Sequence, residues 1–556
     1  MTESTWQTIQ AGEQQIAVTK NLRIPMRDGI ALVADAYRAV DEPDTVKPRP
    51  ALVALSPYGK ELQALALTMP PQRRPSPMWD GCIEAGDIAR VVANDYVHVI
   101  GDLRGSGGSE GEHIGNYNAG GVPLGQDATT SSNGSRHSLV RRQRRHDRHL
   151  LLRVDAGPRR RGTPAVTQGH LRLRRPLRLL RDHLPRRHHV LMPRAAREGR
   201  GGDSGWAFTD RVKSRMLETH SAEEIERLVA ERLQDPDVQA WPNLVHTLHY
   251  PTNHEAWFDI VMNDVDGDWY EERNPVNLAE NIDIPVWLQI DQGRGWTMDG
   301  TIECFDRIPA ANKKLTIGPY PPMQSRPFIE EHDKMFRWYD RWLKGIDNGI
   351  DTEPAVSVFV EGTREYAEGD SFPPKPVEHR ELFLRPRGKL SFEPEAMGVE
   401  HAAPDGFFQA PLTVTDKVEI LRWSTSVFEE PTELMGTGAF HLFAAIDQDD
   451  TNWIMRLWDE RPGGTRQLLT TAYLKASMRE LDLERSRSGS PVHPLTRKVP
   501  VEPGVIEEYV LRVYPFAATI LPGHKIVAEL SCDEPLFDDH NALLPPDAFH
   551  VPVGVR

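Results

Sequence analysis

The sequence predicts an α/β domain that carries a helical insertion and is followed by an all-β sandwich. Three observations lead to this fold class. Strand-like and helix-like apolar patterns alternate over residues 15–128 and 276–348, whereas residues 205–275 are patterned mainly as helices. Over residues 350–556, short strand-like runs are separated by Pro and Gly turns, without comparable helices between them. A chain of 556 residues is long enough for several domains of roughly 100–200 residues each.

The first region begins with a pair of strands. Gln15–Ile24 and Ile30–Tyr37 flank Met26-Arg-Asp-Gly29, whose Asp-Gly step suits a tight hairpin. The next patterns predict a buried strand, a short helix and a second buried strand: Ala51–Leu55, Ile88–Ala93 and Tyr96–Ile100. A glycine-rich stretch, Gly101–Ser109, follows directly. This order of elements is typical of an α/β sheet.

The helical insertion begins after residue 204. Ser221-Ala-Glu-Glu224 has the form of a capping box and precedes apolar residues at helical spacing. Ile284–Ile290 and Lys314–Ile317 return to strand character, and His332–Lys344 is an amphipathic helix rich in aromatic residues. The strand candidates of the C-terminal sandwich are Val356–Val360, Glu381–Leu384, Gly438–Ala445, Trp453–Trp458 and Glu507–Val513.

One block of the chain is strongly basic inside an acidic protein. Residues 129–200 contain 20 Arg and no Lys against 4 acidic residues, a local charge of +16 in a chain whose net charge is −15. The same block has no Ile, Phe, Tyr, Trp or Cys, so it can hardly build a packed core. We therefore treat residues 129–204 as an aberrant segment that interrupts the α/β domain.

Four motifs, taken together and in this order, resemble the cocaine esterase and X-Pro dipeptidyl-peptidase group of serine hydrolases. They are Ile24-Pro-Met-Arg-Asp-Gly29, Ser56-Pro-Tyr-Gly-Lys60, Asp102-Leu-Arg-Gly-Ser-Gly-Gly-Ser-Glu-Gly111 and Arg337-Trp-Tyr-Asp-Arg-Trp-Leu-Lys-Gly345. The resemblance covers residues of about 20–128 and 205–540. It implies an α/β-hydrolase domain with an inserted helical cap and a C-terminal jelly-roll sandwich, which agrees with the fold class above.

The resemblance also implies an activity and a set of catalytic residues. The family cleaves esters or amides with a Ser-His-Asp triad, in which histidine takes the proton of the attacking serine and aspartate orients the imidazolium. A tyrosine hydroxyl of the Pro-Tyr motif helps to stabilise the oxyanion, and this role falls on Tyr58. The alternative is that Tyr58 simply packs at the end of a strand.

The nucleophile that the resemblance requires is missing. A Gly-x-Ser-x-x-Gly turn between a strand and a helix is expected some 25–30 residues after Asp127-Ala128, inside the basic block, and it is absent. Ser109 lies in a Gly-x-Ser-x-Gly pattern but precedes Asn116–Gly121, which is not helical, so it does not fit a nucleophile elbow.

A shift of reading frame explains the missing turn. Permitted codons for His146–Arg153, read one base later, encode Met-Thr-Gly-Ile-Ser-Tyr-Phe-Gly, which is the expected elbow. With one base restored before it, Thr129–Arg136 permits Tyr-Asp-Leu-Ile-Glu-Trp-Ile-Ala, and Leu184–His189, read one base later, permits Tyr-His-Gly-Gly-Ile. The different offsets of the first two windows indicate two shifts, near residues 128 and 138, and a third between about 190 and 205 would restore the frame. The codons are compatible choices, so the hypothesis is that residues 129 to about 200 are a frameshifted translation and that the chain is inactive.

Two other interpretations of the basic block stay open. It could be a nucleic-acid-binding module that neutralises phosphates, although it lacks the aromatic residues that stack on bases and has no zinc-ligand spacing. It could also be a solvated, disordered insert. A second function class for the whole chain is a non-catalytic scaffold that uses the C-terminal sandwich for binding.

The acid of the triad is expected after the strand Ile284–Ile290, and the base after the next strand, Lys314–Ile317. Asp291 is the nearest candidate for the acid, with Asp299 behind it, and either could instead cap the following helix. Pro322 stands where the family histidine belongs, so His332 is the candidate base, with a structural role in its helix as the alternative. The candidate catalytic residues are therefore Tyr58, Asp291 and His332.

Composition limits the remaining properties. No run approaches the roughly 18–20 apolar residues of a membrane helix, and the N-terminus shows no secretory signal pattern. The three cysteines, Cys82, Cys304 and Cys532, are too far apart to suggest a disulfide framework or a thiolate metal site. We expect a cytoplasmic protein with a small-molecule ester or peptide substrate, no cofactor, no metal, no nucleic acid and no membrane partner; a homo-oligomer is left open.

Overall fold

The protein is described from a computed structural model. It describes residues 6–11, 13–41, 48–56, 59–64, 67, 85–111, 113–114, 212–239, 242–253, 255–271, 274–292, 295–319, 332–393, 404–410, 415 and 417–533. Several features of the sequence analysis lie outside these ranges, among them Tyr58, Cys82, the basic block 129–204 and Pro322.

The first sheet has five strands in the order β1-β2-β3-β5-β4. Their bounds are β1 Gln7–Ala11, β2 Gln14–Pro25, β3 Ala31–Ala39, β4 Ala51–Ser56 and β5 Val97–Asp102. β2 and β3 form the predicted hairpin, and its turn needs glycine because Gly29 has a φ of 92°. β4 and β5 are parallel, and their carboxyl ends meet where Ser56 pairs with Asp102. The predicted strands of this region are confirmed.

The second sheet has four strands in the order β11-β10-β9-β8. They are β8 Val286–Asp291, β9 Lys313–Gly318, β10 Val356–Val360 and β11 Glu365–Gly369, and the first three are parallel. The sequence analysis assigned Val356–Val360 to the C-terminal sandwich, whereas β10 pairs with β9, with Val356 opposite Leu315. All five residues of β10 are buried, which is typical of an interior strand in a parallel sheet.

Helices next to these two sheets are α1 Lys60–Gln63, α2 Ile88–Ala93, α12 Gly295–Arg307 and α13 His332–Tyr339. A π-helical turn, Asp340–Lys344, continues α13 and ends at Gly345, whose φ is 73°. The Tyr96 hydroxyl donates to Asp340 Oδ1 at 2.6 Å, and Lys344 Nζ lies 2.7 Å from the same oxygen. The fourth motif therefore joins the end of the α/β region to the first sheet.

The predicted helical insertion is present. Its helices are α6 Arg215–Thr219, α7 Ala222–Arg232, α8 Pro236–Gln239, α9 Pro242–His249, α10 Glu255–Met262 and α11 Asp268–Glu271. The Ser221 side chain accepts a hydrogen bond from Glu224 N at 3.2 Å, as the capping box predicts. The helical insertion has a small apolar core, to which Val238, Leu248 and Phe258 belong. We call residues 214–271 the cap.

The remaining short elements among the described residues are two strands and four 3-10 helices. The strands β6 and β7 form a parallel pair. The bounds of these short elements are β6 His113–Ile114, β7 Val212–Lys213, η5 Pro251–Asn253, η6 Pro275–Asn281, η10 Ile350–Thr352 and η11 Ala476–Met478.

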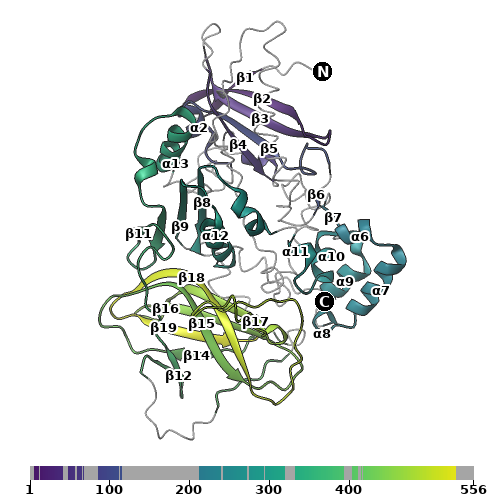
Figure 1. The fold of residues 1–556 in the computed structure, drawn as a ribbon, viewed down its shortest axis with the longest axis vertical. Helices are drawn as coiled ribbons and strands as arrows, with labels where there is room; N and C mark the ends of the chain where they lie inside the picture. Colours follow the sequence, from purple (N-terminus) through teal and green to yellow (C-terminus); the bar gives the residue numbers. More distant parts are fainter. Residues whose placement is uncertain are drawn as a thin grey trace.

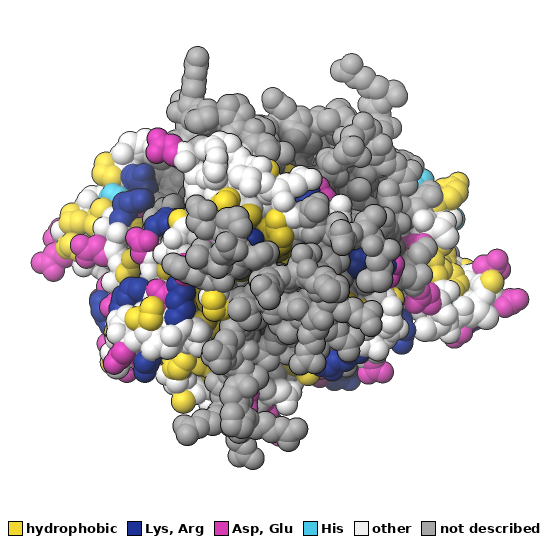
Figure 2. Space-filling view, turned by 90° about the horizontal axis from the view of Figure 1, so that it is seen from above, with side chains coloured by type: hydrophobic (Ala, Val, Ile, Leu, Met, Phe, Trp, Pro, Cys, Tyr) yellow, Lys and Arg dark blue, Asp and Glu magenta, His cyan; other side chains and the backbone are white. Residues whose placement is uncertain are grey.

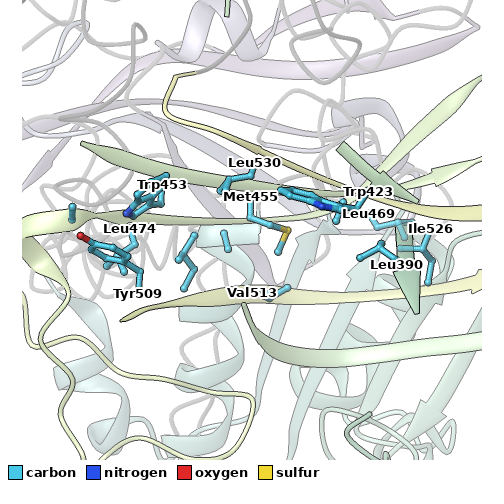
Figure 3. Close-up of a cluster of buried hydrophobic side chains, with 14 of the residues drawn as sticks. Leu390, Trp423, Trp453, Met455, Leu469, Leu474, Tyr509, Val513, Ile526 and Leu530 are labelled. Atoms are coloured by element: carbon cyan, nitrogen blue, oxygen red, sulfur yellow. The ribbon is translucent and has the colours of Figure 1, made fainter. Parts of the chain in front are cut away.

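The C-terminal β-domain, residues 383–533, is built on one eight-stranded sheet in the order β12-β13-β14-β19-β16-β17-β18-β15. The bounds are β12 Phe383–Arg385, β13 Lys389–Ser391, β14 Leu421–Ser424, β15 Thr432–Ala444, β16 Asn452–Glu460, β17 Arg466–Lys475, β18 Glu507–Ile520 and β19 Lys525–Ser531. Its core side chains, including Trp423, Trp453 and Tyr509, lie between strands on both sides (Figure 3).

The parts are arranged along the long axis of the molecule. The first sheet lies at one end, the second sheet in the middle and the C-terminal β-domain at the other end, with the cap helices beside them (Figure 1). Seen from the end with the first sheet, acidic and basic side chains are interspersed over the described surface (Figure 2). Among the described helices, none is long and apolar enough to cross a membrane.

Candidate active site

The candidate site begins at the carboxyl ends of β4 and β5. Tyr58 lies outside the described residues, but the residues that follow it are described. Gly59, with a φ of 89°, precedes α1, and the backbone N–H of Lys60 donates to Asp102 Oδ1 at 2.7 Å. The turn after β4 is therefore held by the last residue of β5.

The Asp102 carboxylate organises the glycine-rich motif as well. Its second oxygen accepts a hydrogen bond from Gly108 N at 2.8 Å. A Cβ atom on Gly107 would lie 2.2 Å from that oxygen, so this close approach requires glycine. Burial raises the pKa of Asp102, although both backbone hydrogen bonds oppose the shift. The sequence analysis quoted Asp102 only as part of a motif and missed its role, which its place at a strand end before a glycine run could have indicated.

A buried ion pair lies below the same turn. Lys60 Nζ is 3.1 Å from Asp35 Oδ1, and both side chains are almost fully buried. Burial alone would lower the pKa of Lys60, but the hydrogen bond to Glu61 and the charge of Asp35 raise it. Burial, followed by the negative charge of Asp35, raises the pKa of Tyr37, whose hydroxyl lies 3.5 Å from Asp35 Oδ2. Lys60 is thus fixed both through its backbone and through its side chain.

Ser109 has a structural role in this framework. Its hydroxyl accepts a hydrogen bond from Val33 N at 2.9 Å and donates one to Asp102 O at 2.8 Å. The residue is 2% exposed. A hydroxyl that bridges two strands in this way is not available for attack on a substrate, which agrees with its rejection as the nucleophile.

Asp291 is the last residue of β8 and pairs with Gly318 at the end of β9. It is 1% exposed. The candidate acid therefore lies at the carboxyl end of a parallel strand, the edge at which α/β proteins place their functional groups.

Asp299, the alternative acid, has a partner in the C-terminal β-domain. Its Oδ1 atom accepts a hydrogen bond from Arg512 of β18 at 2.7 Å. Arg512 also donates to Ser490 Oγ and lies 3.4 Å from Pro491 O. Asp299 therefore connects α12 to the β-domain, and this geometry favours Asp291 over Asp299 as the candidate acid.

His332 is the first residue of α13 and is fully buried. Its ring centroid lies 6.3 Å from that of Phe336, one turn further along the helix. Trp338 of α13 contacts Trp287 of β8 with ring centroids 6.1 Å apart. The elements that carry Asp291 and His332 therefore share one aromatic core.

The described part of the candidate site contains groups that can take part in proton transfer. Within the described parts of the chain, no three His, Cys, Asp or Glu side chains gather closely enough to hold a metal ion. The site instead offers a buried carboxylate, a buried imidazole and turns fixed by Asp102 and Lys60. Carboxylates and imidazoles are the side chains that orient and move a proton in acyl transfer.

Comparison with known proteins identifies the C-terminal part first. The X-Pro dipeptidyl-peptidase C-terminal non-catalytic domain family matches residues 348–540. A protein of Mycobacterium bovis named as a serine esterase is 23% identical over 299 residues, and the cocaine esterase of Rhodococcus sp. is 22% identical over 251 residues. The alignments cover 45% and 40% of this chain and the same shares of the two relatives, so the chain matches less than half of their length.

The fold extends the similarity to nearly the whole chain. The crystal structure of a CocE/NonD family hydrolase from Staphylococcus aureus matches with a TM-score of 0.60 at 16% identity, covering 97% of this chain and 91% of that one. This likeness confirms the predicted fold class, an α/β-hydrolase domain with a C-terminal β-domain. Residues 348–540 thus match the X-Pro dipeptidyl-peptidase C-terminal domain family, and the fold of nearly the whole chain is similar to that of a CocE/NonD family hydrolase.

Proposed function

We propose that this protein derives from a serine hydrolase of ester or amide bonds, and that the chain as it stands lacks the nucleophile and is inactive. The observation that supports the second part is that, among the described residues, the α/β region forms two separate sheets. Among the described strands, β4 pairs only with β5, and β8 pairs only with β9. Leu52 of β4 and Trp287 of β8 nevertheless pack in one cluster with Tyr96 and Phe336.

Each of the two sheets has an open edge, at β4 in one and at β8 in the other, where no described strand is paired. A parallel strand between β4 and β8 would continue both sheets into one, and the nucleophile elbow follows such a strand in hydrolases of this fold. The segment of sequence between the two sheets contains the basic block, and a shifted frame of His146–Arg153 restores a Gly-Ile-Ser-Tyr-Phe-Gly turn. The open edges and the codon argument thus support the same missing element.

The catalytic roles follow from the restored elbow. Its serine would attack the carbonyl carbon, His332 would take the proton and return it to the leaving group, and Asp291 would orient the imidazole. Tyr58 would donate to the oxyanion. Asp102 and Lys60 fix the backbone directly after Tyr58, so they would position this donor.

Two measurements test the proposal. Resequencing of the gene should reveal shifts near codons 128 and 138 and between about 190 and 205, and an unbroken, clean read of the basic block contradicts the frameshift. A fluorophosphonate probe should label the frame-corrected chain and leave the present chain unlabelled. Labelling of the present chain would show that it is active, and no labelling of the folded, corrected chain would favour a non-catalytic binding scaffold.

The acid and base are tested in the corrected chain. Asp291→Asn and His332→Ala should each lower kcat by roughly 10³–10⁴-fold on p-nitrophenyl esters or on Pro-containing p-nitroanilides. Asp283→Asn and Asp333→Asn are matched controls, because both residues are exposed. Asp283 precedes β8, and Asp333 is the second residue of α13. Full activity of Asp291→Asn would remove Asp291 from the triad. The better of the two substrate classes identifies the scissile bond.

A further inference from the structure

The loop after β8 forms a hydrogen bond with the C-terminal β-domain as well as with its own sheet. Gln292 directly follows Asp291 and is 7% exposed. Its Nε2 donates to Phe359 O of β10 at 2.7 Å, and its Oε1 accepts a hydrogen bond from Ala517 N of β18 at 2.7 Å. One side chain therefore connects the end of β8, the interior of its sheet and the C-terminal β-domain.

A second contact from the same strand holds the helix that follows. Arg512 of β18 donates to Asp299 of α12 at 2.7 Å, and only 6% of the Asp299 side chain is exposed. Ser490 and Pro491 accept from the other terminal nitrogen of Arg512. The residue next to Asp291 and the first turns of α12 are thus both tied to β18, which belongs to a different domain.

Such ties matter for a carboxylate that must orient an imidazole. Catalytic groups must be held to within about 0.5 Å of their working geometry, and a displacement of about 1 Å can cost roughly 100-fold in rate. A strand end that is followed directly by a loop has freedom to move unless side chains fix it. The contacts of Gln292 and Arg512 remove this freedom on the carboxyl side of Asp291.

We propose that Gln292 and Arg512 are positioning residues for the triad acid, so that the C-terminal β-domain takes part in setting the geometry of Asp291. This inference rests on the proposed function, in which Asp291 is the acid. It assigns to the β-domain a role in catalysis that goes beyond covering or binding.

The contacts of Gln292 and Arg512 could serve only to dock the β-domain, without any effect on Asp291. A second glutamine at the same boundary distinguishes docking from positioning. Gln467 of β17 donates to Glu361 Oε2 at 2.9 Å across the same boundary between the second sheet and the β-domain. Glu361 follows β10, whereas Gln292 follows β8 and the candidate acid. Gln467→Met therefore removes a similar contact without touching the loop of Asp291.

The first arm of the test uses the present chain and hydrogen exchange. Gln292→Met and Arg512→Met should raise amide exchange in peptides from Val286–Arg307 by about tenfold, with Arg512→Lys showing a smaller increase because it retains one charged contact. Gln467→Met should leave these peptides unchanged. Equal exchange in all four variants and the wild type would overturn the proposal.

The second arm uses the frame-corrected, full-length chain. Gln292→Met should lower kcat roughly 10- to 100-fold with KM within about twofold, and Gln467→Met should leave kcat within about twofold. An equal loss in both glutamine variants, or full activity of Gln292→Met where Asp291→Asn is inactive, would overturn the positioning role. Retained activity of Asp291→Asn would instead show that the acid assignment itself fails, and the inference with it.

Discussion

The junction of the C-terminal β-domain with the end of β10 and its junction with the cap are built from different interactions. The sheet junction joins Glu361 and Gly362, which follow β10, to residues 517–519 of β18. Glu361 N donates to Ala517 O at 3.0 Å, and Thr519 N donates to Glu361 O at 2.7 Å. Ala517 also packs into the core of the second sheet. This junction is made of backbone hydrogen bonds and apolar contact, to which the Gln292 and Gln467 side chains add hydrogen bonds with Ala517 and Glu361.

The ionic junction joins the cap to the β-domain through charged side chains, beside a backbone hydrogen bond from Asp266 N to Leu495 O at 2.8 Å and the packing of Val265. Lys498 Nζ lies 2.7 Å from Asp235 and 2.9 Å from Asp264 of the cap. Lys475 contacts Asp237 of the cap and lies 3.2 Å from Asp450 of its own domain. Figure 1 shows the cap helices beside β17, the strand that ends at Lys475.

The difference predicts how the two junctions respond to their surroundings. Backbone hydrogen bonds and buried apolar contacts depend little on salt or pH, and they tolerate no added volume. Ion pairs with partly exposed partners depend on both, and each contributes modestly. The β-domain is therefore fixed firmly to the second sheet and more adjustably to the cap.

The largest effect is expected at Gly362. Its φ is +90°, and an added Cβ would lie 2.2 Å from Thr519 O. Gly362→Ala should lower the free energy of unfolding by more than about 3 kcal/mol, since the sheet junction must separate. Gly463→Ala is the control, because Gly463 has a φ of +95° with no atom within 4 Å of an added Cβ, so only about 1 kcal/mol is expected. Equal losses in urea unfolding would show that the close contact is unimportant.

A smaller effect is expected at Lys498. Among the described residues, Lys498→Met leaves Arg232 as the basic residue in ion-pair contact with Asp235 and Asp264. With a third of the Lys498 side chain exposed, the loss should be roughly 1–2 kcal/mol, and peptides of the cap should exchange faster. Lys375→Met removes a more exposed ion pair with Glu433 and should cost about 0.5 kcal/mol or less. A loss for Lys498→Met no larger than for Lys375→Met would contradict an ionic junction.

The contribution of Asp235 to the stability of the ionic junction depends on pH with a definite sign. Burial alone would raise the pKa of Asp235, but the hydrogen bond from Lys498 and the charges of Arg232 and Lys498 lower it below the ordinary value of about 3.9. Its stabilisation is therefore complete above that ordinary value and is lost as the pH falls through the lowered pKa. The stability difference between wild type and Lys498→Met should shrink below about pH 4. A difference that stays constant down to pH 3 would contradict this assignment.

Salt should have the smallest effect. Raising ionic strength from 0.1 to 1 M shortens the Debye length from about 10 Å to about 3 Å, which weakens partly exposed ion pairs. Exchange in cap peptides of α7 should increase slightly, whereas exchange in peptides of β10 should not change. An equal response of both regions would mean that the two junctions do not differ in kind.

The sequence alone determined which elements form and, in outline, what they carry. The Asp-Gly hairpin, the apolar strands at Ala51–Leu55 and Tyr96–Ile100 and the Ser221 capping box were all predictable, because each depends on neighbouring residues. Asp291 and His332 could be chosen as candidates because they lie near the end of a strand pattern and the start of a helix pattern. Their shared core, by contrast, could not be predicted.

Only the tertiary structure decided how distant segments combine. An apolar run such as Val356–Val360 is compatible with either sheet, and its pairing with β9 depends on contacts some forty residues away. In the same way, no local pattern pairs Asp299 with Arg512 or Gln292 with Ala517. Local periodicity sets the type of an element, whereas burial and hydrogen bonding between remote residues set its partners, and here those partners connect the candidate acid to the C-terminal β-domain.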